Sequence, residues 1–163
     1  TGVDYLPSIV RAAEGMRFFC YGDGELLGSV RRQCEANFFG AYRQGGAVEL
    51  MRAMDAVIVP SRWEGCPYVV LEAWEAGVPV VASRIGGIAD LIQDGRNGLL
   101  VPEGDAGACA NALADLSGNP KKWKTLVDGG RASLGEHSLA RMVEATGNVY
   151  REGCGNGNPS HCG

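Results

Sequence analysis

The chain has 163 residues, enough for one domain with a buried core but short for a complete two-domain enzyme. Its formal net charge is −4 at pH 7 and it contains no block of Lys or Arg, which argues against nucleic acid or an anionic membrane as the main partner. It has no charged-then-apolar leader and no apolar run of membrane-spanning length, so we expect neither a signal peptide nor a transmembrane helix.

The first part of the chain alternates between helix and strand patterns. Amphipathic stretches predict the helices, and short apolar runs without polar alternation predict strands that are buried on both faces. Strands of that kind, separated by helices, indicate a parallel sheet covered on both sides. The predicted elements up to residue 60 are helix 4–14, strand 16–22, helix 24–35, strand 37–40, helix 47–55 and strand 56–60.

The same alternation continues to residue 102 and then gives way to helices. Gly77 and Gly95 are predicted to end two of the helices. The elements predicted after residue 60 are helix 68–77, strand 78–83, helix 88–95, strand 98–102 and helices 105–117, 120–133 and 137–151.

These elements predict a Rossmann-like, doubly wound α/β domain over residues 1–152. Residues 153–163 have no apolar period and are rich in Gly, Asn and Pro, so we interpret them as a flexible tail. A doubly wound half begins with its central strand, whereas this chain begins with a helix pattern. We therefore expect that the first strand lies upstream of Thr1, or that another segment takes its place.

The six cysteines show no C-x-x-C spacing, so they predict neither a zinc site nor a disulfide framework. We expect them to be thiols in a reducing cytosol. They are Cys20, Cys34, Cys66, Cys109, Cys154 and Cys162.

The most specific pattern is the run PSRWEGCPYVVLEAWEAGVPVV at 60–81. It follows a predicted strand, and in a doubly wound sheet ligands bind at that edge, near helix N-termini whose free N–H groups attract anions. Pro67 suits the first helical position, where a missing N–H costs nothing. The N–H groups of Gly65, Cys66 and Tyr68 remain as candidate donors to a phosphate or diphosphate.

Two carboxylates flank this candidate anion site. Glu72 lies about one turn past Tyr68, and its side chain tilts back toward the helix N-terminus. Glu64 precedes the helix. Because a carboxylate can accept hydrogen bonds from two hydroxyls, Glu72 can hold a ribose diol while Glu64 holds hydroxyls of a sugar on the other side of a diphosphate. The spacing therefore predicts a nucleotide-sugar site.

These residues resemble the C-terminal, nucleotide-sugar-binding domain of family 4 retaining glycosyltransferases. The signature of that family is a Glu, seven residues, a second Glu, then Ala and a G-x-P-V strand, and it is matched by Glu64, Glu72, Ala73 and residues 77–80. The resemblance covers about residues 2–150, and further matches in the same order are GDG at 22–24, FFGAY at 38–42, GG at 86–87 and DGRNGLLVP at 94–102.

The resemblance implies a GT-B fold, in which this chain is the second of two Rossmann-like domains, and a role for each matching residue. Glu64 would contact the transferred sugar as the candidate catalytic residue, and Glu72 would contact the ribose. Backbone groups would contact sugar and phosphate at Gly65, Cys66, Tyr68 and Val69, and the base at Gly40, Ala41 and Tyr42.

The sequence also departs from the family pattern. Thr1 stands where family members have a Lys that neutralises the diphosphate, and the position of the partner Arg lies off the chain. Asp90 replaces a Glu, and Pro67 replaces a Gly found in many members, which removes one N–H donor. Arg62 is either a surface residue or a substitute cation near the sugar.

The resemblance further implies transfer of a hexose from a UDP- or GDP-sugar to a glycan, lipid or small-molecule acceptor held by a missing N-terminal domain. It implies front-face attack assisted by the departing diphosphate, in which no protein nucleophile is assured, and no cofactor. No metal is expected, since no D-x-D run is present. We expect the isolated chain to be inactive as a transferase, and its location to be cytoplasmic, with any membrane contact made by the missing domain.

Two alternatives stay open at this point. The chain could be a non-catalytic nucleotide-binding module, or part of a nucleotide-sugar epimerase of the GT-B type. The retained Glu64 and Glu72 spacing favours the transferase over the epimerase.

Overall fold

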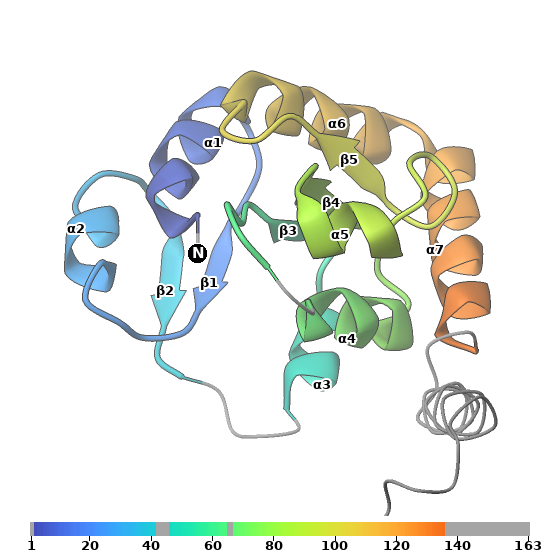
Figure 1. Cartoon of the computed structure of the whole chain (residues 1–163). Coiled ribbons are helices and arrows are strands. Elements are labelled where there is room, and N and C mark those ends of the chain that lie inside the picture. Colours follow the sequence, from blue (N-terminus) through green and yellow to red (C-terminus); the bar gives the residue numbers. More distant parts are fainter. Residues whose placement is uncertain (1, 42–45, 65–66, 136–163) are drawn as a thin grey trace, which may run out of the picture.

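The computed structural model describes residues 2–41, 46–64 and 67–135 (Figure 1). The predicted helix 137–151 and the predicted tail 153–163 lie outside these residues. The helices are η1 (Val3–Tyr5), α1 (Leu6–Ala12), α2 (Leu27–Arg31), α3 (Ala47–Met51), α4 (Tyr68–Ala76), α5 (Gly86–Leu91), α6 (Ala106–Gly118) and α7 (Pro120–Leu134). The strands are β1 (Phe19–Tyr21), β2 (Asn37–Phe39), β3 (Val57–Val59), β4 (Val80–Ser83) and β5 (Leu99–Val101).

The predicted α/β class is confirmed, since parallel strands alternate with helices along the chain. The strands form two hydrogen-bonded groups rather than one continuous sheet. One group is the parallel pair β1–β2, with Cys20 opposite Phe38, and the other is the parallel order β3–β4–β5, with Ile58 opposite Val81. Among the described strands, β1 and β3 therefore each have one neighbour.

Two apolar clusters cover the opposite faces of β4, whose four residues are all buried. Val81 joins the cluster that contains Leu113 and Leu126 from α6 and α7. Its neighbour Val80 joins the cluster that contains Trp74 from α4 and Ile88 from α5. Successive side chains of a strand point to opposite faces, so these clusters make β4 the best-covered strand of the described part of the chain.

Several helices are shorter than predicted, among them α2 and α3, and two helix ends differ at a residue that was predicted to start or stop the helix. Helix α5 ends at Leu91 instead of continuing to Gly95, because Ile92 is extended and Gly95, with φ +75°, belongs to the following turn. Pro67 is the N-cap residue of α4 and not its first helical residue. The prediction for Gly77 is confirmed, since it ends α4 in the left-handed conformation.

Three of the six cysteines lie in the described residues, and all three are free thiols. Burial raises the pKa of Cys109 to about 11, and the pKa of Cys20 to about 11 with a smaller contribution from Cys34. These two thiols are therefore protonated at neutral pH and poor nucleophiles.

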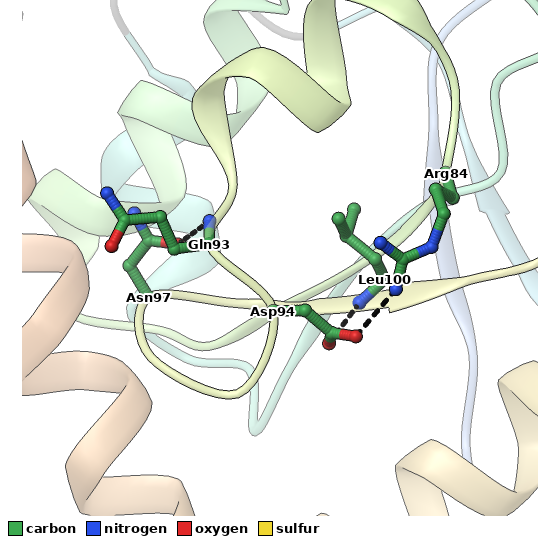
Figure 2. A network of polar contacts seen from close by, with 5 residues as sticks. All are labelled: Arg84, Gln93, Asp94, Asn97 and Leu100. Carbon is green, nitrogen blue, oxygen red and sulfur yellow. Dashed lines mark hydrogen bonds and ion pairs between the residues drawn. The ribbon is translucent and has the colours of Figure 1, made fainter.

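The turn after α5 is held by side chains within the family-like run 94–102 (Figure 2). The carboxylate of Asp94 accepts from the Leu100 N–H at 3.0 Å and from the Arg84 guanidinium at 2.6 Å. The side-chain oxygen of Asn97 accepts from the Gln93 N–H at 2.7 Å. Asp94 therefore links the residue after β4 to β5. These hydrogen bonds explain the motif 94–102 without a ligand.

Helix α7 packs closely against that turn at Gly129, where a Cβ atom would lie 2.0 Å from the Arg96 carbonyl oxygen. We expect Gly129→Ala to lower the free energy of unfolding by about 1–3 kcal/mol, because the helix must move away from the turn. Gly118→Ala in α6 is the matched control, since its Cβ would meet nothing within 4 Å and alanine favours a helix by about 1 kcal/mol. Urea denaturation measures both, and equal effects of the two substitutions would contradict this account.

Candidate functional site

The loop that leaves β3 leads directly into α4, and it carries the predicted sugar site. Strand β3 ends at Val59 and α4 begins at Tyr68. Because β3 and β4 are parallel, the start of this loop lies at the same sheet edge as Ser83, where β4 ends. The N-terminus of α4 is thus at the carboxyl edge of the strands, as predicted for an anion site.

Glu64 is half-buried in this loop, and its carboxylate accepts a hydrogen bond from the Ser61 hydroxyl at 2.9 Å. The Ser61 residue is only 7% exposed, so the bond holds the carboxylate in one orientation. We did not predict a role for Ser61 from the sequence. The signal was the spacing of a hydroxyl residue three positions before the acid, inside the run SRWE.

Glu72 lies on α4 and is half-buried, one turn after Tyr68. Tyr68 is 71% exposed, and Val69 is half-buried. Gly65 and Cys66, the other predicted contacts to sugar and phosphate, lie outside the described residues. The contacts within the described part of the chain link Glu64 to Ser61 and do not link it to Glu72.

The predicted base-binding residues lie at a second place on the strand ends. Gly40 and Ala41 follow β2 and line an open hollow of about 460 Å³, whereas Tyr42 lies outside the described residues. Tyr21 and Phe39 form another wall of the hollow, and their rings stack with centroids 4.9 Å apart. The sequence reasoning did not single out this aromatic pair, which only the pairing of β1 with β2 brings together.

The remaining wall of this hollow is the start of α3, from Gly46 to Leu50. Among the described residues that line it, none comes from the 60–72 segment. A second, larger cavity is lined both by Tyr21 and Leu50 of this hollow and by Ser61 and Val69 of the 60–72 segment, so the two sets of candidates border a shared cavity.

Arg62 is occupied by contacts to the N-terminal turn. Its guanidinium forms an ion pair with Asp4 at 2.6 Å and lies over the Tyr5 ring, 4.4 Å from the centroid. These contacts tie the loop after β3 to η1. These contacts explain the position of the Arg62 side chain without a role as a substitute cation near the sugar.

The described residues contain no cluster of three or more His, Cys, Asp or Glu side chains arranged to hold a metal ion. None of their helices is both long enough and apolar enough to cross a membrane.

Residues 2–119 match the model of the protein family described as "Glycosyl transferases group 1". The chain belongs to this family. One relative is a D-inositol 3-phosphate glycosyltransferase of Saccharomonospora viridis, which is 40% identical over 111 residues, covering 67% of this chain and 26% of the relative.

Solved structures of the GT-B class share the fold of the chain over their C-terminal part. Sucrose-phosphate synthase from Thermosynechococcus elongatus matches with a TM-score of 0.80 and 24% identity, covering 96% of this chain and 43% of that protein. Anabaena HepE, crystallised in complex with UDP and glucose, matches with a TM-score of 0.78 and 22% identity, covering 92% of this chain and 43% of HepE. The chain thus spans less than half the length of the relative from Saccharomonospora viridis and of these two proteins.

Proposed function

We propose that the chain is the nucleotide-sugar-binding domain of a retaining glycosyltransferase, which transfers a hexose from a UDP- or GDP-sugar to an acceptor held by a second domain. The observation that carries this proposal is the placement of Glu64 and Glu72 on either side of the N-terminus of α4, at the carboxyl edge of the strands. The complex of HepE with UDP and glucose supports a nucleotide-sugar as the ligand.

In this arrangement Glu64 and Glu72 hold hydroxyl groups and do not act as general acid and base. The N–H groups at the start of α4 would receive the diphosphate, where the helix dipole favours negative charge. Glu64 is oriented by Ser61 and would bind the sugar, and Glu72 would bind the ribose. The hollow beside Tyr21 and Gly40 offers an aromatic wall and exposed backbone for the base.

The test is calorimetric titration of the chain with UDP, GDP, UDP-glucose and GDP-mannose, with ATP as a control nucleotide. We expect one of the two bases to give saturable binding in its nucleoside diphosphate and sugar-linked forms. The chain alone should transfer no sugar, because the acceptor site and the cations for the diphosphate are expected on other parts of the protein. Absence of binding by all four ligands would contradict the proposed function, and transfer at the rate of a two-domain relative would contradict the need for a second domain.

A further inference from the structure

The loop that follows β3, residues 60–64, packs against η1 through its backbone. Gly2 is the N-cap residue of η1 and is buried. A Cβ atom on Gly2 would lie 1.6 Å from the Pro60 carbonyl oxygen and 3.3 Å from the Ser61 Cα. Because a side chain at this position would have to push the loop away, the two backbone segments are in close contact.

The side chain of Arg62 adds a second contact between this loop and η1. Its guanidinium pairs with Asp4 at 2.6 Å, and its Cζ lies 4.4 Å from the centroid of the Tyr5 ring. Both partners belong to η1. An arginine suits the two contacts at once, because its N–H groups lie in the plane of the guanidinium whereas its face can cover an aromatic ring.

Tyr5 is itself held against a third element, the turn between β5 and α6. A Cβ atom on Gly104 in that turn would lie 2.8 Å from the Tyr5 hydroxyl oxygen and 2.9 Å from its Cζ. Gly104 has φ +72°, a conformation that favours glycine, and the absence of a side chain there gives the ring its room. The Tyr5 ring therefore lies between the end of the sheet and the guanidinium of Arg62.

The far end of the loop depends on the residues that contact η1. Trp63 is 79% exposed, so its side chain adds little packing. The Glu64 carboxylate is held by the Ser61 hydroxyl at 2.9 Å, and Ser61 is one of the residues that pack on Gly2. The position of Glu64 is thus set through residues that are fixed by η1.

We propose that Asp4 and Tyr5 are positioning residues for the sugar site. They act through Arg62, which fixes the loop in the conformation that presents Glu64 to the transferred sugar. Asp4 and Tyr5 do so without touching the ligand themselves. This inference rests on the proposed function, because only there does Glu64 bind a sugar.

The ribose site should not share this dependence on η1. Glu72 lies on α4, which is fixed in the core by Val70 and Trp74, exposed by 0% and 1%. Loss of the contacts to η1 should therefore weaken the binding of the sugar and leave the binding of the nucleoside diphosphate unchanged. A loss of overall stability would weaken both ligands alike.

The first test is calorimetric titration of the chain and of Asp4→Asn with UDP, UDP-glucose, GDP and GDP-mannose. Asparagine keeps the size of the side chain and removes its charge. We expect the affinity for the sugar-linked form to fall about fivefold in Asp4→Asn, and the affinity for the matching diphosphate to stay within about twofold. Asp4→Glu keeps the carboxylate and should bind both forms within about twofold of the parent chain.

Asp115→Asn is the matched control for the loss of an exposed ion pair. Asp115 lies on α6, is about as exposed as Asp4, and pairs with Lys122 on α7. It should bind both forms as the parent chain does. Because exposed ion pairs contribute little to stability, the midpoint of thermal unfolding should stay within about 4 °C of the parent value in both asparagine variants.

A double-mutant cycle shows whether Asp4 acts through Arg62. If the two residues work as one pair, Asp4→Asn combined with Arg62→Gln should lose no more affinity for the sugar-linked form than the weaker-binding single variant. Additive losses would mean that Arg62 contacts the ligand by itself, and they would overturn the proposal.

A measurement without ligand follows the loop directly. We expect the NMR order parameter of the Trp63 amide to fall in Asp4→Asn, whereas that of Trp74 on α4 stays unchanged. An unchanged Trp63 amide, or an Asp4→Asn chain that binds the sugar-linked form within twofold of the parent chain, would overturn this inference alone. A parent chain that binds none of the four ligands would instead overturn the proposed function, and the role of Asp4 and Tyr5 in sugar binding with it.

Discussion

Replacement of Asn97 by alanine should lower the free energy of unfolding by about 3 kcal/mol, since it removes three hydrogen bonds that each contribute about 0.5–1.5 kcal/mol. Asn97 is 1% exposed. Its side-chain oxygen accepts from the Gln93 N–H at 2.7 Å, and its amide nitrogen donates to the Leu91 carbonyl at 3.3 Å and to the Ser133 hydroxyl at 2.9 Å. Alanine removes all three of these hydrogen bonds.

The effect should be large because Asn97 connects three elements. Its side chain joins the end of α5 to Ser133 on α7, and its backbone carbonyl accepts from the indole N–H of Trp74 on α4 at 2.7 Å. Loss of the side chain therefore loosens the contact between α7 and the helix that carries Glu72. We expect the midpoint of thermal unfolding to fall by about 6–12 °C for a domain of this size.

Asn111→Ala is the matched control for this experiment. Asn111 is the same residue type, but it is exposed on α6, where surface substitutions change stability by about 0.5 kcal/mol or less. Urea and thermal denaturation of both variants give the comparison. If Asn97→Ala were as stable as Asn111→Ala, the three hydrogen bonds would not be the source of the stability of this turn.

The α/β fold could be predicted because its signals are local. The apolar run 56–60 and the glycine at 77 each indicate a strand or a helix end within a few residues, and β3 and the end of α4 lie where expected. Helix α5 ends before the predicted position, because Gly95 shapes the turn of the 94–98 loop and does not cap the helix. A glycine with positive φ serves a helix cap and a turn equally well.

The candidate site was less predictable because it depends on contacts between distant residues. Glu64 and Glu72 could be found from their spacing around a helix start, since that spacing is local. The bond from Ser61 to Glu64 is also local, but the spacing of the two residues does not show that the hydroxyl turns toward the carboxylate. The stacking of Tyr21 on Phe39 requires the pairing of β1 with β2, which no single stretch of sequence encodes.

The pairing of Arg62 with Asp4 is another contact between distant residues that the local sequence does not predict. From the sequence alone, an arginine beside a candidate diphosphate site could serve as its cation. In the structure a carboxylate 58 residues away along the chain takes the guanidinium at 2.6 Å, and the Tyr5 ring lies beneath it. A long-range contact thus gives Arg62 a structural explanation that its local position did not suggest.

Glu72→Ala should weaken the binding of UDP or GDP by about 10- to 100-fold, because a hydrogen bond to a charged group contributes about 1.5–3 kcal/mol. If Glu72 holds the ribose, the loss must be the same for the nucleoside diphosphate and for its sugar-linked form. Glu75→Ala is the matched control, since Glu75 is exposed on the same helix, three residues further on. Calorimetric titration measures all of these affinities.

In the same titrations, Glu64→Ala distinguishes the role of Glu64 from that of Glu72. Because Glu64 would hold the sugar and not the ribose, its loss should reduce the affinity for the nucleotide-sugar and leave the affinity for the nucleoside diphosphate unchanged. Ser61→Ala should act in the same direction with a smaller effect, since the carboxylate remains but loses the hydroxyl that orients it. Equal losses for both ligands in the Glu64 variant, or no loss in the Glu72 variant, would show that the two acids do not divide the ligand in this way.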